Sequence, residues 1–375
     1  MAVGTRTDID AAHLAHAIEL AERGRGQVSP NPLVGAVLAR DNETLGEGHH
    51  TAFGAAHAER EAIVAAGDAD LSGATLYVSL EPCCHHGKTP PCTEAIVEAG
   101  IRRVVVASDD PTEHASGRGL GILRDEGIEV EVASGPLAAR ARLVNQAFRK
   151  HARTGRPHIV FKSAMTLDGK VATEGGDSKW ISGPRSRELV HRWRSEADAV
   201  AVGVGTVMAD DPQLTARFEG AGRQPRRVVF DSMGRLPLGS RLVAEAPGIP
   251  LTVIVSRAAP RTATEALESS GVEVVIATGG NEPARVASAL DLLGAAGIGS
   301  ILLEGGPHLA GAFLDAGEVD EVRLFVAPMM LGGRGARSPV EGEGAESIAE
   351  AVAALSLQCR EIDDDLLITA RLREW

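Results

Sequence analysis

The sequence predicts an α/β protein with two domains, and three observations support this prediction. The chain has 375 residues, more than one ordinary hydrophobic core needs at roughly 150 residues per domain. Its composition, 44% hydrophobic and 24% charged, is that of a globular protein. In both halves, apolar runs of strand length alternate with amphipathic stretches of helix length, which is typical of a sheet covered by helices.

The first half is expected to open with a helix at 8–23, because its apolar residues recur on one helical face and Gly24 follows it. A turn at 29–32, rich in proline, then ends this first segment. The elements expected after that turn are a strand at 33–39, a helix at 56–66, a strand at 75–80, a helix at 92–99, a strand at 103–107, a helix at 118–126, a strand at 129–132 and a basic helix at 137–153.

The second half is expected to begin at the turn-forming segment 154–157, which divides the chain into domains 1–153 and 154–375. Its expected strands are 158–164, 199–202, 227–230, 251–255, 272–276, 300–303 and 321–326, with a closing pair near 358–362 and 366–372. Helices are expected between them at 185–195, 283–296 and 308–315.

Charge and composition exclude several classes of partner. The formal net charge of −13 argues against a protein that coats nucleic acid, because phosphate binding needs a basic surface. No apolar run reaches the ~20 residues that span a membrane, and residues 1–10 lack a signal-like apolar run. Cys83, Cys84 and Cys92 lie close together, which favours metal binding in a reducing compartment over disulfides. We therefore expect a cytoplasmic protein, and a core thiol at the isolated Cys359.

The strongest chemical signal is His57-Ala58-Glu59, followed by Pro82-Cys83 and then by Cys92. Zinc prefers imidazole and thiolate ligands, and a catalytic zinc keeps its fourth position open for water. Zinc lowers the pKa of that water to roughly 7, and a nearby carboxylate can move protons from the water to leaving ammonia. Zinc-dependent nucleobase deaminases carry a signature of this kind. The pattern predicts His57, Cys83 and Cys92 as ligands and Glu59 as the catalytic residue.

The cysteine cluster is also compatible with a structural zinc site or with no metal at all. A structural zinc would take Cys84, His85 or His86 as its fourth ligand and would leave no open position for chemistry. Ordinary packing of buried thiols near a histidine would involve no metal.

The segment between the two cysteine ligands carries a family resemblance, because generic nucleobase deaminases lack its long insert. The sequence resembles the bifunctional riboflavin-biosynthesis deaminase/reductase family, and the resemblance covers essentially the whole chain. The matching motifs are Pro30-Asn31-Pro32-Leu33-Val34-Gly35, His57-Ala58-Glu59 and Pro82-Cys83-Cys84-His85-His86-Gly87-Lys88-Thr89-Pro90-Pro91-Cys92. The resemblance implies an N-terminal cytidine-deaminase-like three-layer α/β/α domain and a C-terminal dihydrofolate-reductase-like α/β domain.

Roles in the first domain follow from this resemblance. It implies that His57, Cys83 and Cys92 hold Zn²⁺, that Glu59 shuttles protons, and that Asn31 and Lys88 contact the substrate. It also implies a position near the site for His49 and a phosphate contact for the turn Gly117-Arg118-Gly119.

The chain departs from the family pattern at two positions of the first domain. Cys84 stands where the family has serine, so it is not assigned as a ligand. Thr112 replaces the asparagine of the family's Asp-Pro-Asn turn, and it lacks the paired donor and acceptor of a carboxamide.

Two glycine-bearing turns in the second half, at 202–206 and 304–306, favour a dinucleotide site. Glycines let the backbone approach a phosphate, and helix N-termini attract anions, although tight strand-to-helix turns account for the pattern as well. This half resembles the NADPH-dependent reductase half of the same family. The resemblance implies cofactor contacts from Ala164, Trp180, Thr206, Asp210, Ser232, Gly306, Pro307, His308, Leu309, Ala310, Gly311 and Ala312. It implies substrate contacts from Ser178, Arg194, Leu214, Arg217 and Glu304, with the arginines on the phosphate and Lys162 near the reacting sugar carbon.

The implied activity has two steps on a small-molecule substrate. The first is zinc-dependent hydrolytic deamination of 2,5-diamino-6-ribosylamino-4(3H)-pyrimidinone 5′-phosphate, and the second is reduction of the ribosyl group to ribityl by NADPH. A homodimer or homotetramer is expected. Two rival hypotheses stay open: a nucleobase or tRNA-editing deaminase fused to an unrelated α/β domain, and a regulatory nucleotide-binding protein whose zinc is structural.

Overall fold

The computed structural model describes residues 6–86, 90–113 and 115–375. The chain forms two compact units, Met1–Thr154 together with Trp375, and Gly155–Glu374. The division after Thr154 lies beside the boundary expected from the sequence, whereas nothing in the sequence indicated that Trp375 joins the first unit. In the described part of the chain, no helix is both long and apolar enough to cross a membrane.

The first unit is built on a five-stranded sheet with the order β2-β1-β3-β4-β5. β1 (Gly35–Arg40) pairs antiparallel with both β2 (Glu43–His49) and β3 (Thr75–Val78). β4 (Arg103–Val106) and β5 (Glu129–Val132) continue the sheet parallel to β3. The central strands are buried on both faces, which explains why they read as continuous apolar runs in the sequence.

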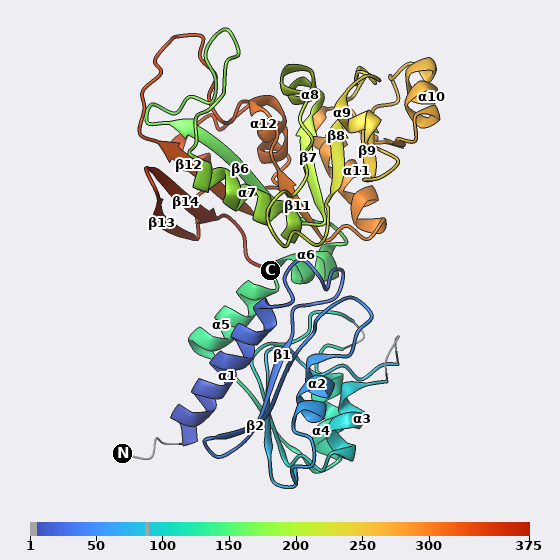
Figure 1. The fold of residues 1–375 in the computed structure, drawn as a ribbon, viewed down its shortest axis with the longest axis vertical. Coiled ribbons are helices and arrows are strands. Elements are labelled where there is room, and N and C mark those ends of the chain that lie inside the picture. Colours follow the sequence, from blue (N-terminus) through green and yellow to red (C-terminus); the bar gives the residue numbers. More distant parts are fainter. Residues whose placement is uncertain (1–5, 87–89, 114) are drawn as a thin grey trace. The chain divides into compact units, whose positions relative to one another are not determined.

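Helices cover both faces of this sheet and make the unit a three-layer α/β/α domain (Figure 1). α1 (Arg6–Glu22) and α5 (Gly135–Val144) lie side by side on one face. α2 (Ala58–Ala65), α3 (Cys92–Glu98) and α4 (Arg118–Asp125) lie on the other. The core under α1 and α5 includes Leu14, Ile18, Val37, Tyr77 and Val105, and the opposite core includes Leu38, Ala62, Leu76, Val104 and Leu123.

Strand β2 was not expected from the sequence, because its glycines and glutamates do not resemble a strand. The structure explains the glycines by close packing against α2. A Cβ on Gly48 would lie 2.3 Å from the Ala58 carbonyl oxygen and 2.5 Å from the Ala62 nitrogen, so no side chain fits there. Packing against α2 therefore requires glycine at this position of β2, and the same glycine makes the strand hard to recognise in the sequence.

The expected helix at 137–153 is two helices, α5 and α6 (Gln146–Thr154). Asn145 lies between them and is buried. Its side-chain Oδ1 accepts a hydrogen bond from Leu33 N at 2.8 Å, and its Nδ2 donates to Leu33 O at 2.9 Å. The Asn145 side chain thus pairs with the backbone of a residue far away in the sequence, at the point where α5 ends and α6 begins.

The second unit contains a nine-stranded sheet with the order β10-β9-β8-β7-β11-β6-β12-β14-β13. Its first seven strands in this order are parallel, and β14 and β13 complete it antiparallel. The strands are β6 (His158–Thr166), β7 (Ala199–Gly203), β8 (Arg226–Phe230), β9 (Leu251–Val255), β10 (Glu273–Ile276), β11 (Ser300–Leu303), β12 (Glu321–Ala327), β13 (Ser356–Ile362) and β14 (Asp365–Arg371).

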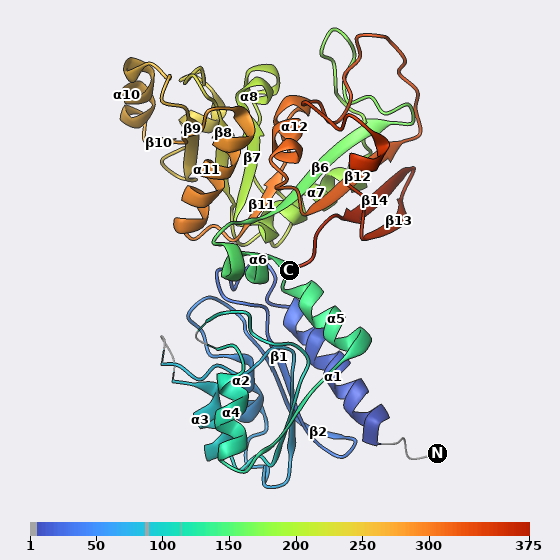
Figure 2. The same ribbon diagram turned by 180° about the vertical axis from the view of Figure 1, so that it is seen from behind.

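Helices pack on both faces of this second sheet, with α11 and α12 on the face turned to the viewer in Figure 2. The helices are α7 (Pro184–Glu196), α8 (Val204–Asp210), α9 (Arg241–Ala244), α10 (Arg261–Ser269), α11 (Glu282–Ala295) and α12 (Pro307–Asp315), with a short 3₁₀ turn η1 (Ile348–Glu350). Helices α8, α9 and α10 were not expected. Cys359, expected in the core, is instead exposed on the edge strand β13, so that prediction was wrong.

Candidate active sites

The three expected metal ligands lie together in the first unit. His57 immediately precedes α2, Cys83 lies in the loop after β3, and Cys92 is the first residue of α3. His57 Nδ1 is 3.4 Å from Cys83 Sγ and 3.3 Å from Cys92 Sγ, and the three ligand atoms all lie within 4.8 Å of one another. Three elements of the fold therefore converge on one point.

The separations in this cluster fit a tetrahedral zinc ion. With Zn–N of about 2.0–2.1 Å and Zn–S of about 2.3 Å, neighbouring ligand atoms are roughly 3.3–3.8 Å apart. Cys83 Sγ also accepts a hydrogen bond from Cys92 N at 3.3 Å. Hydrogen bonds from the side chains of Cys92 and His57 outweigh burial and lower the pKa of the Cys83 thiol to about 4. The hydrogen bond with Cys83 raises the pKa of the Cys92 thiol, so the empty cluster favours one thiolate, at Cys83. Zinc binds thiolates, and its charge would hold both sulfurs in that form.

Glu59 lies on the first turn of α2, two residues after the histidine ligand. It is 3% exposed, and its Oε2 has no hydrogen-bond partner within the described part of the chain. Burial, reinforced by the negative charge of Cys83, raises the pKa of Glu59 to about 7. A buried carboxyl group that exchanges a proton near neutral pH suits general acid and base chemistry.

Asn31 is connected to the cluster through a histidine that sequence reasoning missed. His50, not the expected His49, is buried, and its ring lies 5.4 Å from the His57 ring, edge to face. His50 Nδ1 is 3.0 Å from Ala56 O, which can only accept, so this nitrogen carries the proton. His50 Nε2 then accepts from Asn31 Nδ2 at 3.0 Å. The carboxamide oxygen of Asn31 has no hydrogen bond from the described residues and can accept one from a substrate.

The Gly117-Arg118-Gly119 turn does not offer its amides to a phosphate as the sequence suggested. The buried Glu81 accepts from Gly117 N at 2.9 Å and from Gly119 N at 3.1 Å. Arg118 N donates to Ala115 O at 2.6 Å. The turn is therefore held by a carboxylate next to the zinc-ligand loop, and its three N–H groups are already paired.

The remaining expected residues of the first unit take different positions. Asp110 Oδ1 accepts from Thr112 N at 2.8 Å, so the substituted threonine closes a local turn. Burial raises the pKa of Asp110, although hydrogen bonds from Thr112 oppose the shift. Cys84 is half-buried and stands apart from the metal cluster. Lys88 lies outside the described residues.

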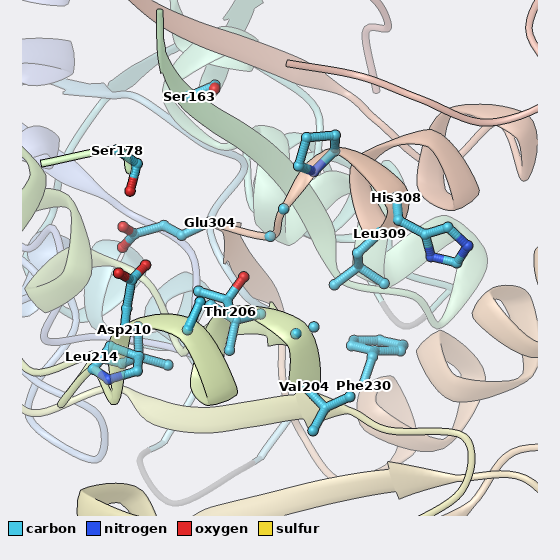
Figure 3. Close-up of a pocket in the computed structure, with 18 of the residues that line it drawn as sticks. Ser163, Ser178, Val204, Thr206, Asp210, Leu214, Phe230, Glu304, His308 and Leu309 are labelled. Atoms are coloured by element: carbon cyan, nitrogen blue, oxygen red, sulfur yellow. The ribbon is translucent and has the colours of Figure 1, made fainter. Parts of the chain in front are cut away.

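The second unit contains a cavity of about 1160 Å³ at the carboxyl ends of its parallel strands, where α/β sheets bind ligands. Residues that follow β7, β8, β9 and β11 line it, together with the last part of β6. Glu304, Ser178 and Asp210 lie at one end of the cavity, and His308, Leu309 and Phe230 lie at the other (Figure 3). The two sides of the cavity therefore differ in chemistry: one carries carboxylates and a hydroxyl group, and the other carries an imidazole and apolar side chains.

Most residues that the sequence assigned to the reductase site line this cavity. They are Lys162, Ala164, Ser178, Trp180, Arg194, Thr206, Asp210, Leu214, Arg217, Ser232, Glu304, Gly306, Pro307, His308 and Leu309. Ala310, Gly311 and Ala312 do not line it, because they are buried within α12. A Cβ on Gly311 would lie 1.9 Å from Glu341 O, so this glycine is explained by packing.

A buried charge cluster forms one wall of the cavity. Arg194 Nε donates to Glu304 Oε1 at 2.6 Å and Arg194 Nη2 donates to Glu304 Oε2 at 3.0 Å. Lys162 Nζ is 4.0 Å from Glu304 Oε2. Burial lowers the pKa of Lys162, whereas the two cations overcome burial and hold the pKa of Glu304 below its ordinary value. The sequence suggested that Arg194 binds phosphate bidentately, but Glu304 occupies that face of the guanidinium.

Two long loops approach each other beside the cavity and were not recognised from the sequence. Ala172 and Arg337 form an isolated antiparallel bridge between them, and both residues line the cavity. Asp168 accepts from Leu331 N at 3.0 Å and from Gly332 N at 2.7 Å. These contacts join segments that are far apart in the sequence, so no local pattern could reveal them.

Comparison with known proteins matches each unit to a family. Residues 7–108 match the cytidine and deoxycytidylate deaminase zinc-binding region, and residues 157–368 match the RibD C-terminal domain. The chain is 42% identical to riboflavin biosynthesis protein RibD of Actinobacillus pleuropneumoniae over 365 residues, which cover 97% of this chain and 95% of that protein. It is 38% identical to RibD of Escherichia coli over 377 aligned positions, covering 96% and 98% of the two chains.

Solved structures give the same result. RibD of Acinetobacter baumannii superposes with a TM-score of 0.85 at 35% identity, covering 98% of this chain and 99% of that one. A diaminohydroxyphosphoribosylaminopyrimidine deaminase/5-amino-6-(5-phosphoribosylamino)uracil reductase of Thermotoga maritima superposes with a TM-score of 0.84 at 36% identity, covering 98% and 100%.

The fold and the two sites define a two-domain enzyme that joins a deaminase of the cytidine type to a reductase. The first domain is cytidine-deaminase-like and binds Zn²⁺, and the second uses NADPH. The chain belongs to the RibD family, the bifunctional deaminase/reductases of riboflavin biosynthesis.

Proposed function

We propose that the first unit removes the 2-amino group of a pyrimidinone carrying a ribosylamino 5′-phosphate, and that the second unit reduces the ribosyl group of the product. These are the two activities named for the Thermotoga maritima protein. The observation that carries the proposal is the convergence of His57, Cys83 and Cys92 beside the buried, unpartnered oxygen of Glu59.

In the deamination, water replaces the amino group of the ring and ammonia leaves. Zinc, when bound by the three ligands, supplies the Lewis acid that makes water nucleophilic at neutral pH. Glu59 is the proton carrier: its buried Oε2 takes a proton from water and gives one to the departing amino group. We assign Asn31 and Lys88 to the substrate, with His50 fixing the orientation of the Asn31 carboxamide.

In the reduction, the ring-opened ribosylamino group gains a hydride at C1′ and a proton, and NADPH supplies the hydride. We assign the cofactor to the cavity residues Ala164, Trp180, Thr206, Asp210, Ser232 and 306–309. Ser178, Leu214, Arg217 and the charge cluster hold the substrate, with Arg217 on its 5′-phosphate. Lys162 is the buried group that can hold the proton beside the reacting sugar carbon.

A two-stage assay on Glu59→Gln tests the proposal. We expect ammonia release from the diamino substrate to fall at least 100-fold, in line with loss of general acid–base catalysis, while zinc content is kept. NADPH oxidation should persist when the deaminated intermediate is supplied. Glu61→Gln, on the same helix but outside the ligand cluster, is the matched control and should behave like the unsubstituted protein. Ammonia release that survives Glu59→Gln would contradict the assigned role.

We also propose that the chain assembles as a homodimer or homotetramer in the cytoplasm. The edge strand β13 and the segment before it expose apolar side chains, which is a common property of subunit interfaces. These side chains are Ile348, Val352, Leu355 and Leu357. A reducing compartment keeps the two cysteine ligands from oxidising to disulfides, so that both sulfurs stay available to zinc. Light scattering on the protein and on Leu357→Asp tests the assembly, and a monomer in both would exclude it.

A further inference from the structure

The two cavity arginines that the sequence assigned to the substrate, Arg194 and Arg217, differ in whether a carboxylate neutralises their charge. Arg194 gives two donors to the two oxygens of Glu304, and its Nη1 donates to Thr215 O at 3.1 Å. Its charge is therefore neutralised within the protein. Arg217 forms no ion pair with any carboxylate of the described residues. Arg217 is the cation of this pair whose charge remains for a ligand.

Arg217 is held instead by a neutral side chain. Its Nη1 donates to Thr215 Oγ1 at 2.6 Å. Burial lowers the pKa of Arg217, and the nearby charges of Arg194 and Arg241 act in the same direction. An incoming dianion would relieve this repulsion, because it supplies the negative charge that the protein withholds from Arg217.

Thr215 contacts both arginines through different atoms. Its carbonyl oxygen accepts from Arg194, its hydroxyl oxygen accepts from Arg217, and the residue is 7% exposed. His191 Nδ1 lies 3.0 Å from the same carbonyl, to which it donates. Burial, together with Arg194, lowers the pKa of His191, which favours its uncharged form.

The backbone around Thr215 is fixed independently of the arginines. Leu214, just before it, has a φ of 56°, in the left-handed region. The carboxamide of Gln224 clamps Ala216 through two hydrogen bonds of 2.9 Å, one from Ala216 N and one to Ala216 O. The backbone of Thr215 is thus held in place, and its hydroxyl oxygen gives the guanidinium of Arg217 a fixed hydrogen-bond acceptor.

We propose that Thr215 is a positioning residue that holds Arg217 in the orientation needed to bind the 5′-phosphate of the reductase substrate. The inference rests on the proposed function, because it takes that phosphate as the ligand of Arg217. Arg194, in this arrangement, orients Glu304 and Thr215 and is not the main phosphate ligand. A phosphate bound at Arg217 would be recognised through a preorganised guanidinium, which loses little side-chain entropy on binding.

The test uses the complete enzyme and two forms of the deaminated intermediate, with and without the 5′-phosphate. The measured quantity is the ratio of kcat/KM for the two forms. A second readout is the Kd of ribose 5-phosphate, measured by calorimetry with NADPH present. We expect Thr215→Val to lower the ratio about tenfold, through KM, as for loss of one hydrogen bond to a charged group. Thr215→Ser keeps the hydroxyl and should restore the ratio to within about twofold.

A double-substitution cycle shows whether Thr215 acts through Arg217. Adding Thr215→Val to Arg217→Gln should lower the ratio no further, because the arginine that it positions is gone. Thr264→Val, on α10 outside the cavity, is the control for the substitution itself and should leave the ratio unchanged.

The outcomes distinguish a failure of the positioning role of Thr215 from a failure of the phosphate assignment to Arg217. An unchanged ratio in Thr215→Val, a Thr215→Ser variant as impaired as Thr215→Val, or an equal further loss in the Arg217→Gln background would overturn the positioning role. If Arg217→Gln itself left the ratio and the Kd of ribose 5-phosphate unchanged, the assignment of the phosphate in the proposed function would fail instead.

Discussion

Substitution of Glu304 by alanine is expected to destabilise the second unit strongly. Glu304 and Arg194 have side chains only 10% and 13% exposed, and they share two hydrogen bonds. Removing one partner of a buried ion pair leaves the other charge uncompensated, at a cost of roughly 3–5 kcal/mol. Here Lys162 loses its carboxylate neighbour as well. We therefore expect Glu304→Ala to lower the free energy of unfolding by about 3–5 kcal/mol.

The matched control for this substitution lies on the same helix as Arg194. Glu188 and Arg192 form an ion pair whose side chains are 42% and 57% exposed. Glu188→Ala should cost less than about 1 kcal/mol, because solvent already screens that pair. Urea unfolding followed by tryptophan fluorescence, to which the buried Trp193 on the same helix contributes, measures both effects. Equal losses in the two variants would refute the expected cost of an uncompensated buried charge and would show that water reaches Glu304.

The same carboxylate makes stability depend on pH in a definite direction. The pKa of Glu304 is held below its ordinary value of 4.5 in the folded protein. A depressed folded pKa means that its contribution is complete above pH 4.5 and is lost as the pH falls toward the folded pKa. As the pH is lowered below 4.5, the urea concentration at the unfolding midpoint, measured by tryptophan fluorescence, should therefore decrease. Glu304→Ala should lose part of this dependence on pH.

Three further substitutions test the first unit. Gly48→Ala forces a Cβ against the backbone of α2 and should cost roughly 1–3 kcal/mol in thermal unfolding, whereas Gly121→Ala, with nothing within 4 Å, should not destabilise. Asp10→Asn removes the negative charge and one of the two acceptors to which Arg103 donates at 2.7 Å; because these bonds lower the pKa of Asp10, the variant should lose acid-dependent unfolding near and below pH 3.8. Cys83→Ser should abolish zinc retention while NADPH oxidation of the deaminated intermediate continues.

Patterns that repeat along the chain allowed much of the fold to be predicted from sequence. The buried parallel strands of both units are continuous apolar runs, and most of the helices between them are marked by their periodicity, although α8, α9 and α10 were not expected. Strand β2 escaped because Gly46 and Gly48 are required by close contact with α2, a contact between different elements. The break at Asn145 has the same kind of cause, since its partner is the distant Leu33.

The site was predictable where a residue's chemistry alone defines its role. Two thiols and an imidazole near a glutamate indicate zinc whatever the fold, and the three ligands do converge. The roles of His50 and Arg194 depend on partners that spacing cannot reveal. Both His49 and His50 had the right chemistry, and only the three-dimensional structure shows which of them faces Asn31.

X-ray absorption at the zinc edge of the purified enzyme tests the central claim most directly. We predict two sulfur ligands at about 2.3 Å and two nitrogen or oxygen ligands at about 2.0–2.1 Å, of which His57 supplies one and solvent the other. A spectrum with three sulfurs would place Cys84 on the metal. Two imidazoles in the fit would place His85 or His86 there, and either result would contradict an open position for the attacking water.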